Sequence, residues 1–292
     1  MRQSAVKKTS VFFLGCYRLS FVLLSLPEQL TLVRLFTAPD KRALLRKRPR
    51  IVFKYLHRYL FTSARRAERL AALTNHYKYL TRRTTPHFFE KLVNEKPCMW
   101  RQDSDETRIE ICLTFPYPAD QEGDLGLQLV MNGKRLQIIS FSIIPGSLIG
   151  EPDEQILFVG RVQGLVASEK IRHATKCCRD ITPCALLMAA LDGVTKAFGI
   201  RTIVGVGSKE QLSTTHVDTG DRLHFDYDQF WASLHAEKTA TDFYRLASPM
   251  VHKALESVPS NHRKRTRLKR EFKTQVSDAV ESYLRQHCLL PE

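Results

Sequence analysis

The chain has 292 residues, enough for one large or two modest globular units, and 43% of them are apolar, as in ordinary water-soluble proteins. Its mean hydropathy of −0.26 argues against several membrane spans. The formal net charge of +15 favours anionic partners, namely nucleic acid, acidic lipid or lipopolysaccharide.

Residues 1–27 form an apolar N-terminal segment. Lys7 and Lys8 precede a short apolar stretch that ends at Leu14, shorter than the core of a secretory signal. Arg18 separates that stretch from the next one, so no uninterrupted run reaches the roughly 20 residues of a membrane-spanning helix. We predict an amphipathic or peripheral helix here, with a secretory signal as the alternative.

Residues 28–100 show helical periodicity. Apolar side chains recur every three or four positions between Ile51 and Leu60 and again between Leu70 and Leu80. Asp40 is placed to cap a helix that starts at Lys41. These patterns predict a helical N-terminal region.

The periodicity changes in residues 101–260, which we expect to form an α/β region. Alternating apolar residues predict strands over 108–115, 126–130, 135–144 and 156–159, and the Asn-Gly pair at 132–133 predicts a hairpin turn. These strands would form an antiparallel meander. A helical region over 168–198, divided at Pro183 and ended by Gly199, then leads to a strand over 201–206. A basic C-terminal helix is expected within 261–292. The predicted fold class is α+β, with a helical N-terminal part, a mainly antiparallel sheet and flanking helices.

Positive charge gathers in two runs. Ten Lys and Arg residues and no acid lie in 41–66, and seven lie in 261–273, whereas residues 101–160 carry ten acids against four bases. Three interpretations of these runs are open. They are solvated helix faces, or they pair with the acidic 101–160 region of the same chain, or they form a surface for anionic lipid and lipopolysaccharide. The candidate anion-binding residues are Arg46, Lys47, Arg48, Arg263, Lys264, Arg265, Arg267, Lys269 and Arg270.

The seven cysteines are odd in number and form no CxxC pair, which indicates reduced thiols in the cytoplasm. The ten histidines show neither HxxxH nor HExxH spacing, so we predict no metal site. No GxSxG motif, P-loop or nucleophilic triad is found, and no catalytic residue is assigned.

Six segments in one order carry a resemblance to a known family. They are Asn75-His-Tyr77, Glu122-Gly-Asp-Leu125, Leu136-Gln-Ile-Ile-Ser-Phe-Ser142, Leu157-Phe-Val-Gly-Arg-Val-Gln-Gly164, Asp226-Tyr-Asp-Gln-Phe-Trp231 and the basic stretch from Pro259 to Arg270. Over residues 28–285 the chain resembles the VirK/YbjX family, the DUF535 domain. The resemblance implies a Gram-negative bacterial protein with a role in envelope integrity, resistance to cationic peptides and virulence. It brings no settled catalytic mechanism.

The chain departs from the family pattern at two places. Gly207-Ser-Lys209 stands where the pattern has Asn-His, and His235 stands where it has Gly. Any activity that depends on those positions is not carried over to this chain.

A second resemblance concerns the order of elements, which is similar to that of GNAT-type acyltransferases. It places a pyrophosphate site at Arg161, Gln163, Gly164 and Ala167, with acyl-CoA as the implied cofactor. Val166 departs from that motif, and a plain strand-to-helix turn is the alternative interpretation.

Asp226, Tyr227, Asp228 and Trp231 form a candidate polar cluster. The two carboxylates are either a base or cation site, or part of a loop that packs two aromatic rings and caps a helix.

Three functional hypotheses follow. The first is an envelope-homeostasis protein, cytoplasmic or peripheral at the inner membrane, that acts on lipopolysaccharide or lipid modification. The second is an acyl-CoA-dependent transferase. The third is a nucleic-acid-binding regulator of surface-protein expression, although no helix-turn-helix or RRM signature accompanies the basic runs.

Overall fold

The computed structural model describes residues 26–104, 106–116, 120–213, 225–251 and 254–291. The predicted peripheral segment at 1–27 lies almost wholly outside these residues. Among the described helices, none combines the length and the apolar character needed to cross a bilayer.

Helices dominate the first part of the chain, as predicted. They are α2 (Leu26–Thr37), η1 (Pro39–Lys41), α3 (Arg42–Lys47), η2 (Pro49–Leu56), α4 (Arg66–Arg83) and α5 (Phe88–Asn94). In α4, Leu73, Tyr77 and Leu80 share one buried face, so the helical spacing in the sequence identified this core correctly.

Two local expectations in this region were wrong. Asp40 caps no helix: it lies within the 3-10 turn η1, and the helix that follows has Lys41 at its N-cap without a side-chain cap. The apolar run from Ile51 to Leu60 is not one α-helix. Pro49 opens the 3-10 helix η2 instead, and the chain then bends, with Leu60 at a φ of 67°.

The described residues form one sheet of eight strands in the order β1-β2-β3-β4-β5-β6-β8-β7. Their bounds are β1 Cys98–Asp103, β2 Arg108–Thr114, β3 Leu125–Met131, β4 Lys134–Pro145, β5 Gln155–Gly164, β6 Thr202–Val206, β7 Glu237–Lys238 and β8 Phe243–Ala247. The antiparallel meander β2 to β5 is confirmed, and the turn residues Asn132 and Gly133 have the positive φ values that this hairpin needs. Strand β1 starts inside the region predicted as helical.

The chain leaves β5 through α6 (Ser168–Cys177) and α7 (Pro183–Phe198) and returns as β6, parallel to β5. The predicted division is confirmed, because the Thr182 side chain caps α7 and Pro183 takes its first position. Gly199 ends α7 with a φ of 69°. Two further α-helices follow in the part of the chain that the structure describes, α8 (Tyr227–Ser233) and the basic α9 (Ser260–His287).

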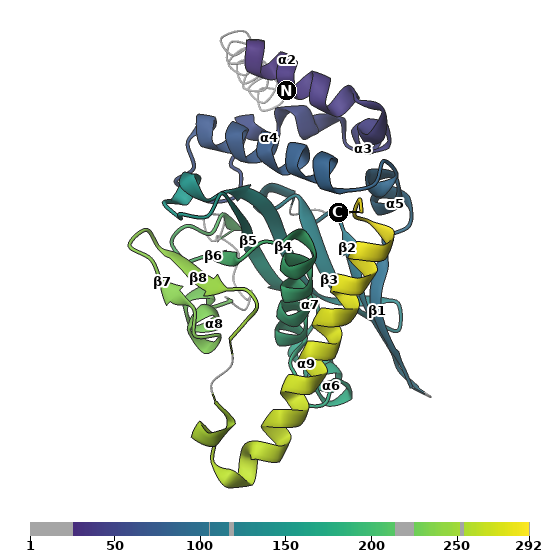
Figure 1. The fold of residues 1–292 in the computed structure, drawn as a ribbon, viewed down its shortest axis with the longest axis vertical. Coiled ribbons are helices and arrows are strands. Elements are labelled where there is room, and N and C mark those ends of the chain that lie inside the picture. Colours follow the sequence, from purple (N-terminus) through teal and green to yellow (C-terminus); the bar gives the residue numbers. More distant parts are fainter. Residues whose placement is uncertain (1–25, 105, 117–119, 214–224, 252–253, 292) are drawn as a thin grey trace, which may run out of the picture.

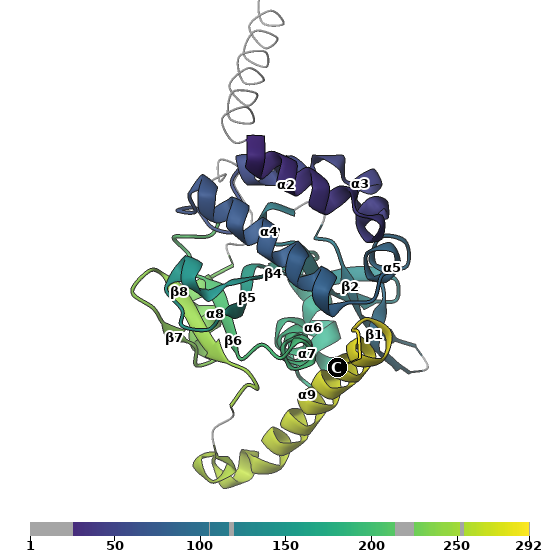
Figure 2. The ribbon, with the colours of Figure 1, turned by 45° about the horizontal axis from the view of Figure 1, so that its top comes forward.

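The strands β2, β3 and β4 present two unlike faces. One is apolar and packs against α7; it carries Ile109, Ile111, Leu113, Leu127, Leu129, Ile139 and Phe141. The other face carries buried polar side chains, namely Thr114, Gln128, Ser140 and Ser142. Figure 1 shows α7 and α9 crossing the front of the sheet and the N-terminal helices forming a layer above it. A second view shows α2, α3 and α4 together at this end (Figure 2).

Candidate functional site

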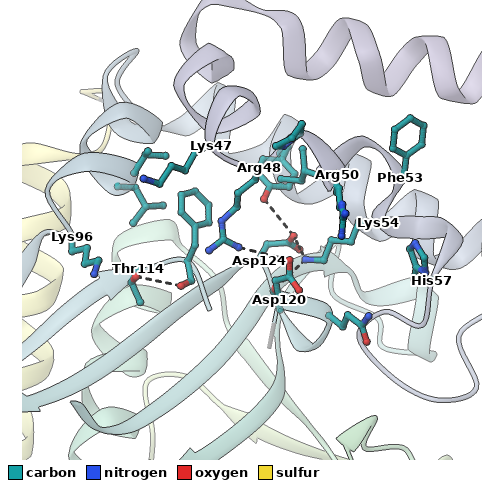
Figure 3. A pocket seen from close by; sticks show the side chains of 18 of the residues that line it. Lys47, Arg48, Arg50, Phe53, Lys54, His57, Lys96, Thr114, Asp120 and Asp124 are labelled. Atoms are coloured by element: carbon teal, nitrogen blue, oxygen red, sulfur yellow. Dashed lines mark hydrogen bonds and ion pairs between the residues drawn. The ribbon is translucent and has the colours of Figure 1, made fainter. Parts of the chain in front are cut away.

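A large pocket lies between the N-terminal helices and the polar face of the sheet (Figure 3). Its volume is about 1310 Å³, at or above the upper end of ordinary small-molecule sites. Its walls come from the end of α3, from η2, α4 and α5, and from the strands β2, β3 and β4. The pocket is therefore built by segments that are far apart in the sequence.

The pocket is both basic and apolar. Of its basic residues, Lys47, Arg50, Lys96 and Arg135 have no carboxylate partner among the described residues. Apolar side chains line the same pocket; they are Ile51, Phe53, Leu56, Leu92, Val93 and Phe115. Unpaired cations beside apolar walls favour a ligand that is anionic at one end and apolar at the other.

A β-bulge brings Arg135 into this pocket. Leu129 pairs with Gln137. The next residue along β3, Val130, pairs with Arg135, so β4 holds one extra residue at this point. Because the bulge shifts the alternation by one position, Arg135 lies on the same face as the pocket residue Gln128. Regular pairing would have turned the guanidinium to the apolar face.

The floor of the pocket is an ion pair between Lys54 on η2 and Asp124 at the start of β3. Lys54 Nζ donates to Asp124 Oδ1 at 2.6 Å and to the Gly123 carbonyl at 3.0 Å. The Asp124 side chain is fully buried, and that of Lys54 is 9% exposed. An ammonium group has three donors, and these contacts use two of them. The same ammonium also lies over the Tyr59 ring, 4.5 Å from its centroid.

Three hydroxyl groups complete the shell around Asp124. Tyr59 donates a hydrogen bond to Oδ2, Ser142 donates to the same oxygen at 2.7 Å, and the Tyr77 hydroxyl lies 3.4 Å from Oδ1. Burial pushes the pKa of Asp124 upward, but the neighbouring charges, led by the Lys54 ammonium, and the hydrogen bonds from Lys54 and Tyr59 together outweigh it, so the pKa lies below its ordinary value. Burial, with the Asp124 charge added, raises the pKa of Tyr59. Asp124 is therefore an anion that fixes Lys54 in place.

The Asn75-His76 pair attaches α4 to the sheet. Strand β3 stops pairing with β4 at Phe141, so the backbone of Ile143 has no strand on that side. His76 Nδ1 accepts a hydrogen bond from Ile143 N at 3.0 Å, and Asn75 Nδ2 donates to Ile143 O at 3.2 Å. Burial lowers the pKa of His76 to about 4, so the ring is neutral and its proton is on Nε2. The pair positions Tyr77, the next residue, beside Asp124.

The structure places the predicted basic residues in three locations. Lys47 and Arg48 line the large pocket, where Arg48 forms an ion pair with Asp120 at 3.8 Å. Arg46 lines a separate hollow of about 410 Å³ with Arg42. The remaining candidates lie at the start of α9, far from α3 in Figure 1.

The basic start of α9 is exposed and only partly paired. Arg265 contacts Asp180 at 2.8 Å, Lys269 donates to the Asp180 carbonyl, and Arg267 lies 3.6 Å from Glu271. These partners lie outside the acidic 101–160 region, so among the described residues this helix does not pair with that region, whereas Arg48 and Lys54 of the first basic run do, through Asp120 and Asp124. Arg263 donates to the backbone carbonyls of 256 and 258, while Lys264 and Arg270 complete the run.

Of the proposed pyrophosphate residues, Arg161, Gln163 and Gly164 lie in strand β5, and Ala167 is the N-cap of α6 after a short strand-to-helix connection. Strand β5 continues to Gly164, five residues beyond the predicted Ile156–Val159 strand. The Arg161 guanidinium forms a largely buried ion pair with Glu122. Gln163 is half-buried and paired with β4, whereas Gly164 and Ala167 are exposed.

The parallel pairing of β5 with β6 covers only Leu157 to Val159. Beyond this point, Tyr227 inserts its hydroxyl between the strands. The hydroxyl lies 3.2 Å from Val162 N and also receives a hydrogen bond from Gln211. The backbone of β5 at Val162 is therefore satisfied by a side chain of α8.

The polar cluster at the start of α8 is engaged in local structure. Asp226 caps the helix by accepting from Gln229 N at 2.8 Å, and Asp228 accepts from Ser208 N at 3.2 Å. Trp231 is fully buried and donates to the Val206 carbonyl. These contacts match the interpretation of a loop that packs two aromatic rings and caps a helix.

The two departures from the family pattern lie close to α8. His235 has a φ of 60°, a backbone conformation that favours glycine. This conformation explains why the family pattern has Gly at this position. Gly207 N donates to the Asp242 carbonyl, and Asp242 accepts from Lys209 N at 3.0 Å. Neither position contributes to the pocket.

Sequence reasoning missed most of the pocket. Lys54 lies in the basic run at 41–66 but was not singled out, Lys96, Gln128 and Arg135 carry no local signal, and Asp124 was noted only as part of a resemblance. No local signal distinguishes Asp124, because an Asp directly before a strand is an ordinary turn residue.

Fold and site together define an α+β protein with a basic, partly apolar pocket beneath a helical layer. The chain belongs to the DUF535 family, described as a protein of unknown function, whose model matches residues 16–282. It is similar to the uncharacterized protein YbjX of Escherichia coli (strain K12), with 24% identity over 250 residues that cover 83% of this chain and 73% of that protein. No solved structure matches the chain.

Proposed function

We propose that this protein binds a phosphate-bearing lipid of the bacterial envelope in the pocket between η2 and the sheet. The observation that carries the proposal is the set of cations without carboxylate partners, Lys47, Arg50, Lys96 and Arg135, around apolar walls. A multiply charged headgroup would satisfy these cations, and its acyl chains would bury the aromatic and aliphatic side chains.

The envelope role expected from the resemblance would then have a physical basis. Lipopolysaccharide and anionic phospholipids both carry phosphate groups on an apolar anchor, and a protein that binds them can support outer-membrane integrity and resistance to cationic peptides. The proposed location is the cytoplasm, with peripheral association at the inner membrane.

The direct test is isothermal titration of the full chain with dihexanoyl phosphatidic acid, a soluble short-chain probe. We expect saturable binding that weakens as salt rises, because the cations are solvent-accessible before binding. Dihexanoyl phosphatidylcholine, which has no net charge, is the neutral comparison and should bind much more weakly.

The variant Lys96→Gln/Arg135→Gln should lower the affinity for the phosphatidic acid by roughly tenfold or more. Lys134→Gln is the matched control, since Lys134 is the exposed neighbour of Arg135 and does not line the pocket. Equal affinity of the double variant and the wild-type chain would contradict the proposal.

A second candidate is an acyl-CoA-dependent transferase, supported by the parallel β5–β6 pair within an otherwise antiparallel sheet. The pairing of Arg161 with Glu122 and the insertion of Tyr227 count against a coenzyme at that position. Thermal denaturation with acetyl-CoA and longer acyl-CoAs separates the candidates, and no shift at millimolar coenzyme would exclude the transferase. Nucleic-acid binding stays a prediction, for which salt-sensitive retention of RNA or DNA is the test.

A further inference from the structure

Helix α2 exposes a row of apolar side chains. Leu26 and Leu30 are each 45% exposed and Val33 is 36% exposed. Their spacing of four and three residues places them on one side of the helix. The adjacent side carries the buried residues that attach α2 to the protein.

This row differs from the other exposed apolar side chains of the described residues. Those are Phe53, Leu165, Val251, Leu268 and Leu290, each on a different segment of the chain. Single exposed apolar residues are ordinary on protein surfaces. Three in a row on one helix indicate a surface that is covered in the working state.

The row is fixed relative to the pocket wall. Gln29 Nε2 donates to the Val52 carbonyl at 3.2 Å, and its Oε1 accepts from the Tyr55 hydroxyl at 2.9 Å. The Phe36 ring lies 4.7 Å from the ring of Tyr77, which lines the pocket. Helix α2 is therefore attached to η2, whose other side forms the pocket.

Positive charge continues the row. Thr37 lies one turn beyond Val33 and lines a hollow with Arg42 and Arg46. Both arginines are exposed, and neither forms an ion pair with a described carboxylate. Residues 26–58 contain nine Lys and Arg against two acids. An apolar row that ends in unpaired arginines is complementary to an anionic membrane surface.

We infer that α2 and the Arg42–Arg46 hollow dock the protein on the anionic leaflet of a lipid bilayer. Leu26, Leu30 and Val33 enter the boundary between headgroups and acyl chains, and the arginines contact lipid phosphates. The inference rests on the proposed function for the class of partner, and it names the surface through which the protein reaches that lipid.

Flotation of the full chain with vesicles tests the inference. Phosphatidylcholine vesicles that contain phosphatidylglycerol should carry the protein, and pure phosphatidylcholine vesicles should carry much less. Leu30→Ser/Val33→Ser should lower the partition coefficient on anionic vesicles by about tenfold or more, because two apolar side chains no longer enter the bilayer. Both positions are exposed, so the fold should be unaffected.

Leu268→Ser is the matched control. Leu268 has the same 45% exposure as Leu30, but it lies on the basic helix α9, the other surface with clustered positive charge. We expect wild-type flotation from this control. Unchanged flotation of the α2 variant, or an equal loss in both variants, would overturn the inference.

A third variant and a soluble ligand separate this inference from the proposed function. Arg42→Gln/Arg46→Gln should weaken anionic-vesicle binding and reduce its dependence on salt. Binding of dihexanoyl phosphatidic acid in the pocket should be the same in wild type and in Leu30→Ser/Val33→Ser. If the wild-type chain floats with anionic vesicles but does not bind dihexanoyl phosphatidic acid, only the proposed function is rejected. If it binds the phosphatidic acid but the α2 variant floats as well as wild type, only the docking surface is rejected.

Discussion

Lys54 Nζ lies 2.6 Å from Asp124 Oδ1, and this contact joins the wall of the pocket to its floor. Lys54 comes from η2 and Asp124 from the sheet, 70 residues later in the chain. The pair is buried, so each charge depends on the other and on the surrounding hydroxyl groups.

The first prediction concerns the stability of this pair. Lys54→Met leaves the Asp124 carboxylate buried without its cation, so the free energy of unfolding should fall by about 3 kcal/mol or more. Urea denaturation measures this loss. Glu110→Gln is the control, because the Arg101–Glu110 pair is half-exposed on the Arg101 side and should contribute less than about 1 kcal/mol. Similar losses in both variants would contradict the assigned role.

The second prediction concerns pH. The pKa of His76 is lowered from 6.5 to about 4 by burial, so the unfolded chain binds a proton in this range that the folded chain does not. Stability is therefore fully present above about pH 6.5 and falls as pH drops toward 4, by about 3 kcal/mol in total. His76→Asn keeps an acceptor for Ile143 N and should flatten this part of the stability curve. His87→Asn replaces an exposed histidine and should leave the slope unchanged.

The third prediction concerns thiol reactivity. Cys98 and Cys112 are directly opposed on β1 and β2, and the hydrogen bond from Cys112 lowers the pKa of Cys98 to about 7. Alkylation by iodoacetamide, followed by mass spectrometry, should label Cys98 with a midpoint near pH 7. Cys112→Ala should move that midpoint upward. An unchanged midpoint in this variant would exclude the proposed hydrogen bond as the cause.

The fourth prediction concerns the contact between α7 and α9. A Cβ atom on Gly193 would lie 2.2 Å from the Ser277 carbonyl oxygen, so Gly193→Ala must separate the two helices. We expect a loss of about 1–3 kcal/mol, measured by chemical denaturation. Gly164→Ala is the control, since its nearest neighbour would be the flexible Gln137 side chain at 3.7 Å. Equal stability of the two variants would show that the helices can move apart freely.

The sequence predicted the meander and the α7–β6 unit because their signals are local. Alternating apolar residues mark strands, and Pro183 and Gly199 mark the ends of α7. It did not predict the bend after η2. There Pro49 and the positive φ of Leu60 redirect a segment whose apolar spacing is helical. Tertiary packing on β5 overrides the periodicity at that point.

The candidate site was less predictable than the fold. The basic run at 41–66 identified Lys47 and Arg48, which do line the pocket, while the run at 261–273 forms the distant start of α9. Residues 161–164, expected to hold a phosphate, lie in strand β5 instead. The sequence could not show this, because the partner of Arg161 is Glu122, 39 residues earlier in the chain.

By itself, the sequence determined the charge of this protein, its α+β class and most of its elements, because these follow from composition and short-range periodicity. Only the tertiary structure brought Lys54 to Asp124, turned Arg135 into the pocket through a bulge and left three side chains of α2 exposed. The first depends on a contact between residues that are 70 positions apart in the chain, the second on the register of the β3–β4 pair, and the third on how α2 packs against the rest of the protein. No local pattern of residues encodes these features.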